Sequence, residues 1–195
     1  MSQEILPYRQ GALDHWCGLY SVVNAIHLLV GPYEDSSCVD IFAEAQCALL
    51  KLRKGRLTSR VEKGVTPKEM KSLLESVSEE FGLGVRTLRL DAGGRQVATL
   101  FGYWRALQRY LERANGRASS RGAYTGMERG IAVVFVSGTY RHWTIVRAAT
   151  NREVLLFDSC GFERIFRRKI TVGRHTRLRP RLVSGSSTFL VYLRE

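Results

Sequence analysis

A cysteine stands where an irregular loop runs into a helix-like pattern, at Cys17-Gly18. The pattern is an apolar stripe at helical spacing, formed by Leu19, Val22, Val23, Ile26, Leu29 and Val30. A thiol at the start of a helix meets unpaired backbone amides and the positive end of the helix dipole, and both favour the thiolate. Because the thiolate is the nucleophilic form of cysteine, Cys17 is the candidate nucleophile.

A thiol nucleophile needs a base, a group that orients the base, and hydrogen-bond donors for the oxyanion. His142 begins one predicted strand, and Asp158 ends the next. A hairpin centred on Thr150 would pair these two residues directly across the ladder and on one face. Asp158 could then hold His142 in the tautomer that faces the thiol. A register slip of one residue would put them on opposite faces.

The candidate oxyanion donors are the Cys17 amide and the side chain of Gln10, seven residues before it. Asn24 and Asn151 are weaker candidates for the same role. Trp143 is either a core residue or a cover for the His142–Asp158 bond.

The remaining thiols and imidazoles have plainer interpretations. Cys38 and Cys47 lie on or beside an apolar helix pattern and are predicted to be packing residues. Cys160, two residues after Asp158, is predicted to be an inert thiol at a strand end, with a place near the site as the alternative. His15 lies close to Cys17, but its loop position favours a surface or substrate-lining role. No chemical role is expected for His27 or His175.

Helices must position the nucleophile. Asp14 is the expected N-cap of the first helix, which places Cys17 at the third position of its first turn, and Gly31-Pro32 ends it. A capping box of Ser37 and Asp40 predicts a second helix over 39–54. Thr66-Pro67-Lys68-Glu69 predicts a third that runs to 81, and a fourth is expected over 97–114.

Strands follow the helices along the chain. They are expected over 85–90, 131–136, 141–149, 153–158, 162–170 and 188–193, with a Gly-, Ser- and Arg-rich loop over 115–130. This order predicts an α+β fold in which N-terminal helices pack against a C-terminal, mostly antiparallel β-sheet. We expect one domain over 1–195, with a mainly helical lobe over 1–120 and a β-sheet lobe over 121–195.

The composition limits the partners and the compartment. None of the four cysteines forms a CxxC pair, so we expect free thiols, no metal and no cofactor. The chain shows neither a signal-peptide pattern nor an apolar run long enough to span a membrane, so we expect a cytoplasmic protein or secretion without a signal.

The net charge is +12, and residues 121–195 carry 14 basic and 5 acidic side chains. This excess predicts a solvated basic face, with an acidic partner surface as the alternative. Nucleic acid is not expected as a partner, because no nucleic-acid-binding motif accompanies the charge.

The order of these residues resembles the papain-like cysteine peptidase superfamily. Gln10, then Cys17-Gly18 opening a helix, then His142-Trp143 on one strand and Asp158 on the next match that family's sequence of roles. The resemblance is closest to the peptidases that process leader peptides at double-glycine sites and to related bacterial effectors. The chain lacks the Cys-Gly-Ser-Cys-Trp core of papain, so the resemblance says nothing of the substrate pockets.

The resemblance implies a papain-like fold and a thiol peptidase that acts on a protein or peptide through Cys17, His142 and Asp158, with Gln10 at the oxyanion. Papain-like folds also carry glutamine deamidases that use the same three residues, which is the first alternative. The second is a basic binding module on a papain-like scaffold without catalysis.

Overall fold

The computed structural model describes residues 6–10, 16–55, 64–92, 97–115, 130–139, 141–174 and 176–193. Asp14, His15 and His175 themselves lie outside these residues, as does most of the predicted 115–130 loop.

Helix α1 spans Cys17–Val30 and ends at Gly31, as predicted. Its N-terminus was predicted wrongly, because Trp16 is the N-cap and Cys17 is the first helical residue. The Trp16 carbonyl accepts hydrogen bonds from the amides of Leu19 and Tyr20, so the first turn starts there without a side-chain cap. Cys17 therefore lies closer to the open end of the helix than the sequence predicted.

Helix α2 spans Asp35–Leu52, and α3 spans Pro67–Glu80. The capping box predicted at Ser37 is wrong, because the amide of Cys38 already bonds to the Glu34 carbonyl and starts the helical ladder earlier. Cys47 was also predicted wrongly as a packing residue, since it is exposed, whereas Cys38 is buried. The capping box of α3 is confirmed, with Thr66 and Glu69 bonding to each other's amides.

Eight strands form one mostly antiparallel sheet in the order β1-β8-β2-β3-β4-β5, with β6 and β7 off this path. The strand bounds are β1 Val85–Arg89, β2 Gly130–Gly138, β3 His142–Ala149, β4 Glu153–Phe157, β5 Arg164–Phe166, β6 Ile170–Val172, β7 Arg181–Val183 and β8 Thr188–Leu193. The strand predicted over 162–170 is wrong as one element, because the 3-10 turn η3 (Arg167–Lys169) separates β5 from β6.

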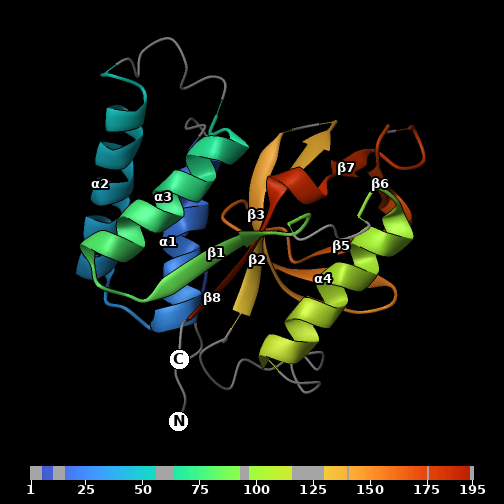
Figure 1. Ribbon diagram of the computed structural model, residues 1–195, viewed down its shortest axis with the longest axis horizontal. Helices are drawn as coiled ribbons and strands as arrows, with labels where there is room; N and C mark the ends of the chain where they lie inside the picture. The colour runs from blue at the N-terminus through green and yellow to red at the C-terminus, as the bar shows by residue number, and fades with distance from the viewer. Residues whose placement is uncertain are drawn as a thin grey trace.

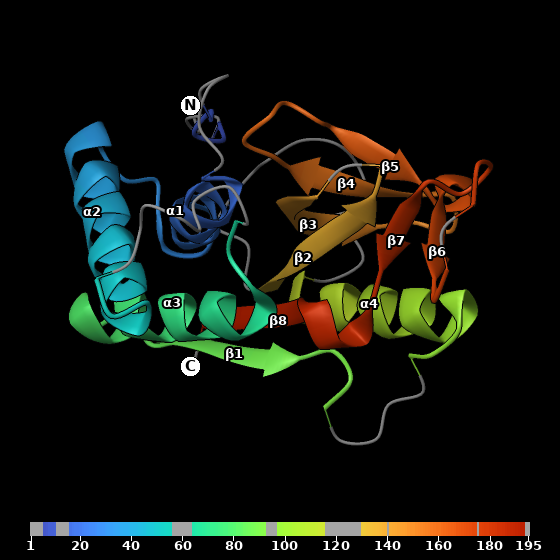
Figure 2. The ribbon, with the colours of Figure 1, turned by 90° about the horizontal axis from the view of Figure 1, so that it is seen from above.

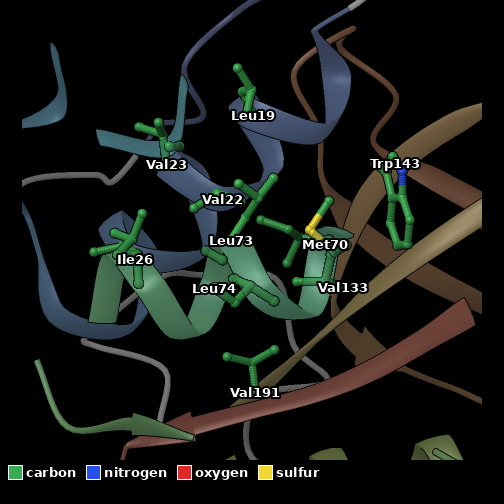
Figure 3. Packing of buried hydrophobic residues seen from close by; sticks show 14 of the residues in the cluster. Leu19, Val22, Val23, Ile26, Met70, Leu73, Leu74, Val133, Trp143 and Val191 are labelled. Atoms are coloured by element: carbon green, nitrogen blue, oxygen red, sulfur yellow. The ribbon is translucent and has the colours of Figure 1, made fainter. Parts of the chain in front are cut away.

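Each face of the sheet carries its own core. Ile131 and Val133 of β2 pack with α1, α2 and α3, whereas Ala132 and Val134 pack with α4 (Leu100–Asn115). Figures 1 and 2 show α1–α3 gathered on one side of the sheet and α4 on the other. In Figure 3, side chains of α1, α3, β2 and β8 meet in the first core. The predicted α+β class, with helices packed on a mostly antiparallel sheet, is confirmed.

None of the helices among the described residues combines the length and the apolarity that a membrane crossing requires.

Candidate active site

His142 and Asp158 lie side by side in the protein interior. The Nε2 atom of His142 is 2.7 Å from Oδ2 of Asp158, and their side chains are 9% and 0% exposed. The two residues come from the start of β3 and from the position just after β4. The sequence predicted this proximity, but the way the hairpin achieves it differs from the prediction.

The β3–β4 register changes by one residue at a bulge. Near the turn, Ala149 lies opposite Val154 and Ala148 opposite Leu155; after the bulge at residue 147, Val146 lies opposite Leu156. Continued without the bulge, the first register would put His142 and Asp158 on opposite faces, because strand side chains alternate. The extra residue returns them to one face.

The same register corrects the predicted pairing. Ile145 lies opposite Phe157 in the last pair of the ladder, and this register, extended by one residue, would set Thr144 opposite Asp158. Asp158 is thus the diagonal neighbour of His142 rather than its direct partner, a separation that long or aromatic side chains still span. The direct-pair prediction failed because the turn is centred between Asn151 and Arg152, where the Thr150 hydroxyl accepts from the Arg152 and Glu153 amides.

The Asp158 carboxylate is fixed by the turn that follows β4. Its Oδ1 atom accepts hydrogen bonds from the amides of Cys160, at 2.8 Å, and Phe162, at 3.3 Å. This is the local bonding by which Asp residues stabilise turns. One carboxylate oxygen therefore shapes the turn while the other holds the imidazole.

The hydrogen bond between His142 and Asp158 favours the charged form of both side chains. Burial of the His142 ring disfavours the imidazolium, but the hydrogen bonds and charges of Asp158 and Cys17 outweigh it and raise the pKa of His142 to about 9. Burial alone would raise the pKa of Asp158, but the hydrogen bond and charge of His142 hold that pKa below its ordinary value. At neutral pH the favoured state is an imidazolium beside a carboxylate.

Cys17 reaches the same imidazole from the first turn of α1. It is 9% exposed, and its nearness to His142 is one of the causes that raise the pKa of that imidazole. The described residues therefore bring together a thiol, an imidazole and a carboxylate in that order.

Gly18 allows the first turn of α1 to lie close to Val65 and Trp143. A Cβ atom on Gly18 would lie 2.5 Å from Cγ2 of Val65 and 3.5 Å from Cδ1 of Trp143. The Val65 carbonyl accepts a hydrogen bond from Trp143 Nε1, at 2.7 Å. Trp143 is 1% exposed within the core, and this bond fixes the strand that carries His142 against the start of α1.

A buried ion pair holds the segment that contains Val65. The Arg53 guanidinium, at the end of α2, contacts both carboxylate oxygens of Glu69 at 2.8 and 3.0 Å and donates to the Gly64 carbonyl at 2.7 Å. Such paired contacts are directional. The ends of α2 and α3 thus support the contact between Val65 and Trp143.

The segment before α1 brings Gln10 to the site. Asn24 of α1 exchanges two hydrogen bonds with the Tyr8 backbone, at 2.7 and 3.1 Å, and the Gln10 amide donates to the Ser159 carbonyl at 2.9 Å. The segment therefore spans from α1 to the turn after β4. Asn24 is occupied in holding it, and Asn151 lies in the distant hairpin turn, where it bonds to Gln108.

Cys160 and Phe162 belong to this cluster; the sequence analysis gave Cys160 a place near the site only as an alternative and gave Phe162 none. The Cys160 sulfur is exposed, 3.9 Å from Nδ1 of His142 and 3.6 Å from Oε1 of Gln10. The Phe162 ring stands edge-on to the imidazole, with centroids 6.1 Å apart. The turn after Asp158, whose carboxylate accepts from the amides of Cys160 and Phe162, was the signal that could have placed both residues near His142.

Comparisons of the chain with protein-family models, with curated proteins and with solved structures gave no match. What can be said of the site therefore rests on its own residues and geometry.

Proposed function

We propose that the protein is a papain-like thiol hydrolase that cleaves peptide or amide bonds of protein substrates. We also propose that residues 1–195 form a single domain. The observation that carries this proposal is the imidazole of His142, which bonds to buried Asp158 and whose pKa is raised by Asp158 and by Cys17 at the start of α1. Thiol, base and orienting carboxylate in this order are the requirements of nucleophilic cysteine catalysis.

In the proposed reaction, Cys17 and His142 rest as a thiolate–imidazolium ion pair, and the Asp158 carboxylate stabilises the imidazolium. The thiolate adds to the carbonyl carbon, and the oxyanion accepts from the Cys17 amide, which has no partner within its helix at the first position. Gln10 is the second proposed donor. His142 then protonates the leaving amine, and water, deprotonated by His142, hydrolyses the thioester to release the acid and restore the thiol.

Mass spectrometry of a panel of proteins incubated with the purified chain tests this proposal. New chain ends are expected, and Cys17→Ala is expected to reduce their rate by on the order of 10⁴-fold or more. Cys38→Ala, which removes another buried thiol beside a histidine, is the matched control and should retain turnover.

Other outcomes point to other functions. Conversion of glutamine to glutamate without new chain ends would replace the peptidase with a deamidase that uses the same residues. No covalent change in any substrate, or full activity in Cys17→Ala, would overturn the hydrolase and favour a binding module.

A second proposed binding site is a pocket lined by arginine residues, which would bind an acidic segment of a partner protein. It has a volume of about 710 Å³ and is lined by Arg152, Arg164, Arg167, Arg168 and Arg179, with Glu153 as its acidic member. The Arg167 guanidinium lies over Trp104 at 5.4 Å, and that of Arg168 lies over Phe166 at 5.5 Å. Stacking orders these groups, so less freedom is lost when they bind a carboxylate.

Binding of a fluorescent acidic peptide tests this surface. Changing Arg164, Arg167 and Arg168 together to Gln should weaken binding by about tenfold or more, whereas the same change at Arg105, Arg109 and Arg113 of α4 is the matched control. Equal weakening by both triple variants would indicate general charge attraction instead. Preferential binding of single-stranded RNA would replace the protein partner.

A further inference from the structure

The proposed mechanism gives no role to Cys160, although its sulfur contacts two groups that have one. The Cys160 thiol donates to Gln10 Oε1 at 3.6 Å, and its sulfur lies 3.9 Å from Nδ1 of His142. The contact with Gln10 is the one that bears on the oxyanion, because the Gln10 side chain is the second proposed donor.

The turn after β4 fixes the position of Cys160. The Asp158 carboxylate accepts from the Cys160 amide at 2.8 Å, and the Gly161 amide donates to the Asp158 carbonyl at 3.2 Å. Gly161 has a φ of 84°, in the left-handed region that glycine adopts without strain. The carboxylate that holds His142 through Oδ2 therefore also holds, through Oδ1, the backbone that carries the Cys160 thiol.

The segment that carries Gln10 lies against the same turn. The Gln10 amide donates to the Ser159 carbonyl at 2.9 Å, and a Cβ atom on Gly161 would collide with the Arg9 guanidinium. These contacts fix where the Gln10 side chain begins, but they do not fix which way its terminal amide is turned. That orientation depends on the groups that bond to the amide oxygen and nitrogen.

The orientation of the Gln10 amide decides whether this side chain can stabilise an oxyanion. A glutamine amide accepts hydrogen bonds through its oxygen and donates them through its nitrogen. A half-turn about the last side-chain bond exchanges the two atoms and would present a second partial negative charge to the oxyanion. A thiol that donates to Oε1 favours the orientation in which Nε2 is the atom left to donate.

We propose that Cys160 is a positioning residue whose thiol holds Gln10 Oε1, so that Gln10 Nε2 donates to the oxyanion of the transition state. This inference rests on the proposed function, since the oxyanion forms only if an acyl group reacts at Cys17. The contact between Cys160 and Gln10 does not rest on it, because the contact is present without a substrate. A thiol is a weak donor, so its loss should loosen the Gln10 amide without removing it.

The orientation is measured without a substrate, by ¹⁵N relaxation of the Gln10 side-chain amide in the full chain. Cys160→Ala should lower the order parameter of this amide to below about 0.6, whereas Cys160→Ser, which keeps a donor, should restore it. Cys47→Ala removes an exposed thiol of α2 and should leave the order parameter unchanged. An unchanged order parameter in Cys160→Ala, with the fold verified by thermal unfolding, would overturn the positioning role.

Turnover then tests whether Cys160 acts through Gln10. Cys160→Ala should lower kcat by about three- to tenfold, the effect of one neutral hydrogen bond. KM should stay within about twofold, because the oxyanion is absent from the ground state. In a Gln10→Ala background the same substitution should have no further effect, since the group that it positions is gone. Equal losses of kcat in the two backgrounds would overturn the action through Gln10.

A failure of the proposed function would give a different result. Undiminished turnover in Cys17→Ala, or no turnover by the parent chain, would overturn the hydrolase and with it the role of Cys160 at an oxyanion. The relaxation measurement on the Gln10 amide would still stand as a test of the contact with Cys160.

Discussion

Two histidines of this protein each lie beside a cysteine, yet their environments differ. Nδ1 of His27 is 3.8 Å from the Cys38 sulfur, and Nδ1 of His142 is 3.9 Å from the Cys160 sulfur. Burial lowers the pKa of His27, with partial opposition from the charge of Asp35, whereas the pKa of His142 is raised to about 9. The difference lies in the carboxylate hydrogen bonded to His142.

Among the described residues, the thiol beside His27 has no carboxylate that bonds to its neighbouring imidazole. Burial raises the pKa of Cys38, which keeps this thiol protonated next to a neutral imidazole. The Asp35 carboxylate accepts instead from the Tyr8 hydroxyl, at 2.7 Å. A histidine and a thiol within 4 Å therefore do not by themselves raise the pKa of the imidazole, and the carboxylate that bonds to the His142 ring accounts for the difference.

Removing each carboxylate should give the largest contrast. Asp158→Asn is expected to lower turnover by about 10²–10⁴-fold, since the base loses the group that orients and charges it. Asp35→Asn, the matched change near His27, is expected to leave turnover within about twofold. Comparable losses in the two variants, measured by the rate of new chain ends, would contradict the comparison.

The two imidazoles should titrate far apart. NMR of the histidine ring protons is expected to give a pKa of about 9 for His142 and a value below 6.5 for His27. Asp158→Asn should lower the first pKa and leave the second unchanged. If both rings titrate near 6.5, the raised pKa assigned to His142 is wrong.

Stability should depend on pH with opposite signs at the two sites. Because the folded pKa of His142 lies above its unfolded value, its contribution of roughly 3 kcal/mol is complete below pH 6.5 and is lost as the pH rises through about 9. The folded pKa of His27 is lowered, so its unfolded form takes up protons and stability falls as the pH drops below 6.5.

Thermal unfolding across pH measures both effects. His142→Gln should flatten the alkaline loss, and His27→Gln the loss near pH 6. An alkaline loss that persists unchanged in His142→Gln would assign it to another group.

A smaller effect is expected from substitutions at two glycines, one next to Cys17 and one at the end of α1. A Cβ on Gly18 would meet Val65 next to Trp143, and one on Gly31 would lie 2.4 Å from the His27 carbonyl oxygen. Alanine at either position is expected to destabilise the fold by about 1–3 kcal/mol in chemical denaturation, because the close contacts must open. Only Gly18→Ala should also reduce any turnover by the folded protein, since it displaces the turn that carries Cys17.

The sequence predicted much of the fold through local signals. The capping box at Thr66, the end of α1 at Gly31 and the buried strand after residue 130 all follow from neighbouring residues. The start of α2 was missed because backbone bonding to Glu34 begins the helix without a capping side chain. The 162–170 strand was wrong because alternating Arg and apolar residues do not reveal a 3-10 turn.

The sequence predicted which residues belong to the candidate site better than it predicted the contacts that they make. Helix start, strand start and strand end suggested Cys17, His142 and Asp158, and the contact between His142 and Asp158 is observed. Cys160 was underrated because its place near His142 depends on the bonding of its amide to the Asp158 carboxylate in the turn after β4. The role of Asn24 in holding Tyr8 depends on residues 16 apart in the chain, which spacing rules do not address.

The bulge at residue 147 also constrains how this hairpin can change length during evolution. Inserting or deleting one residue within either strand between His142 and Asp158 reverses the relative faces of the two side chains, unless the bulge is gained or lost at the same time. A length change at the turn over 150–152 leaves the paired strands in place, because hairpin loops of several lengths can join them. Variants that keep the His142–Asp158 contact should therefore change length at the turn, or within a strand only where the bulge changes with it.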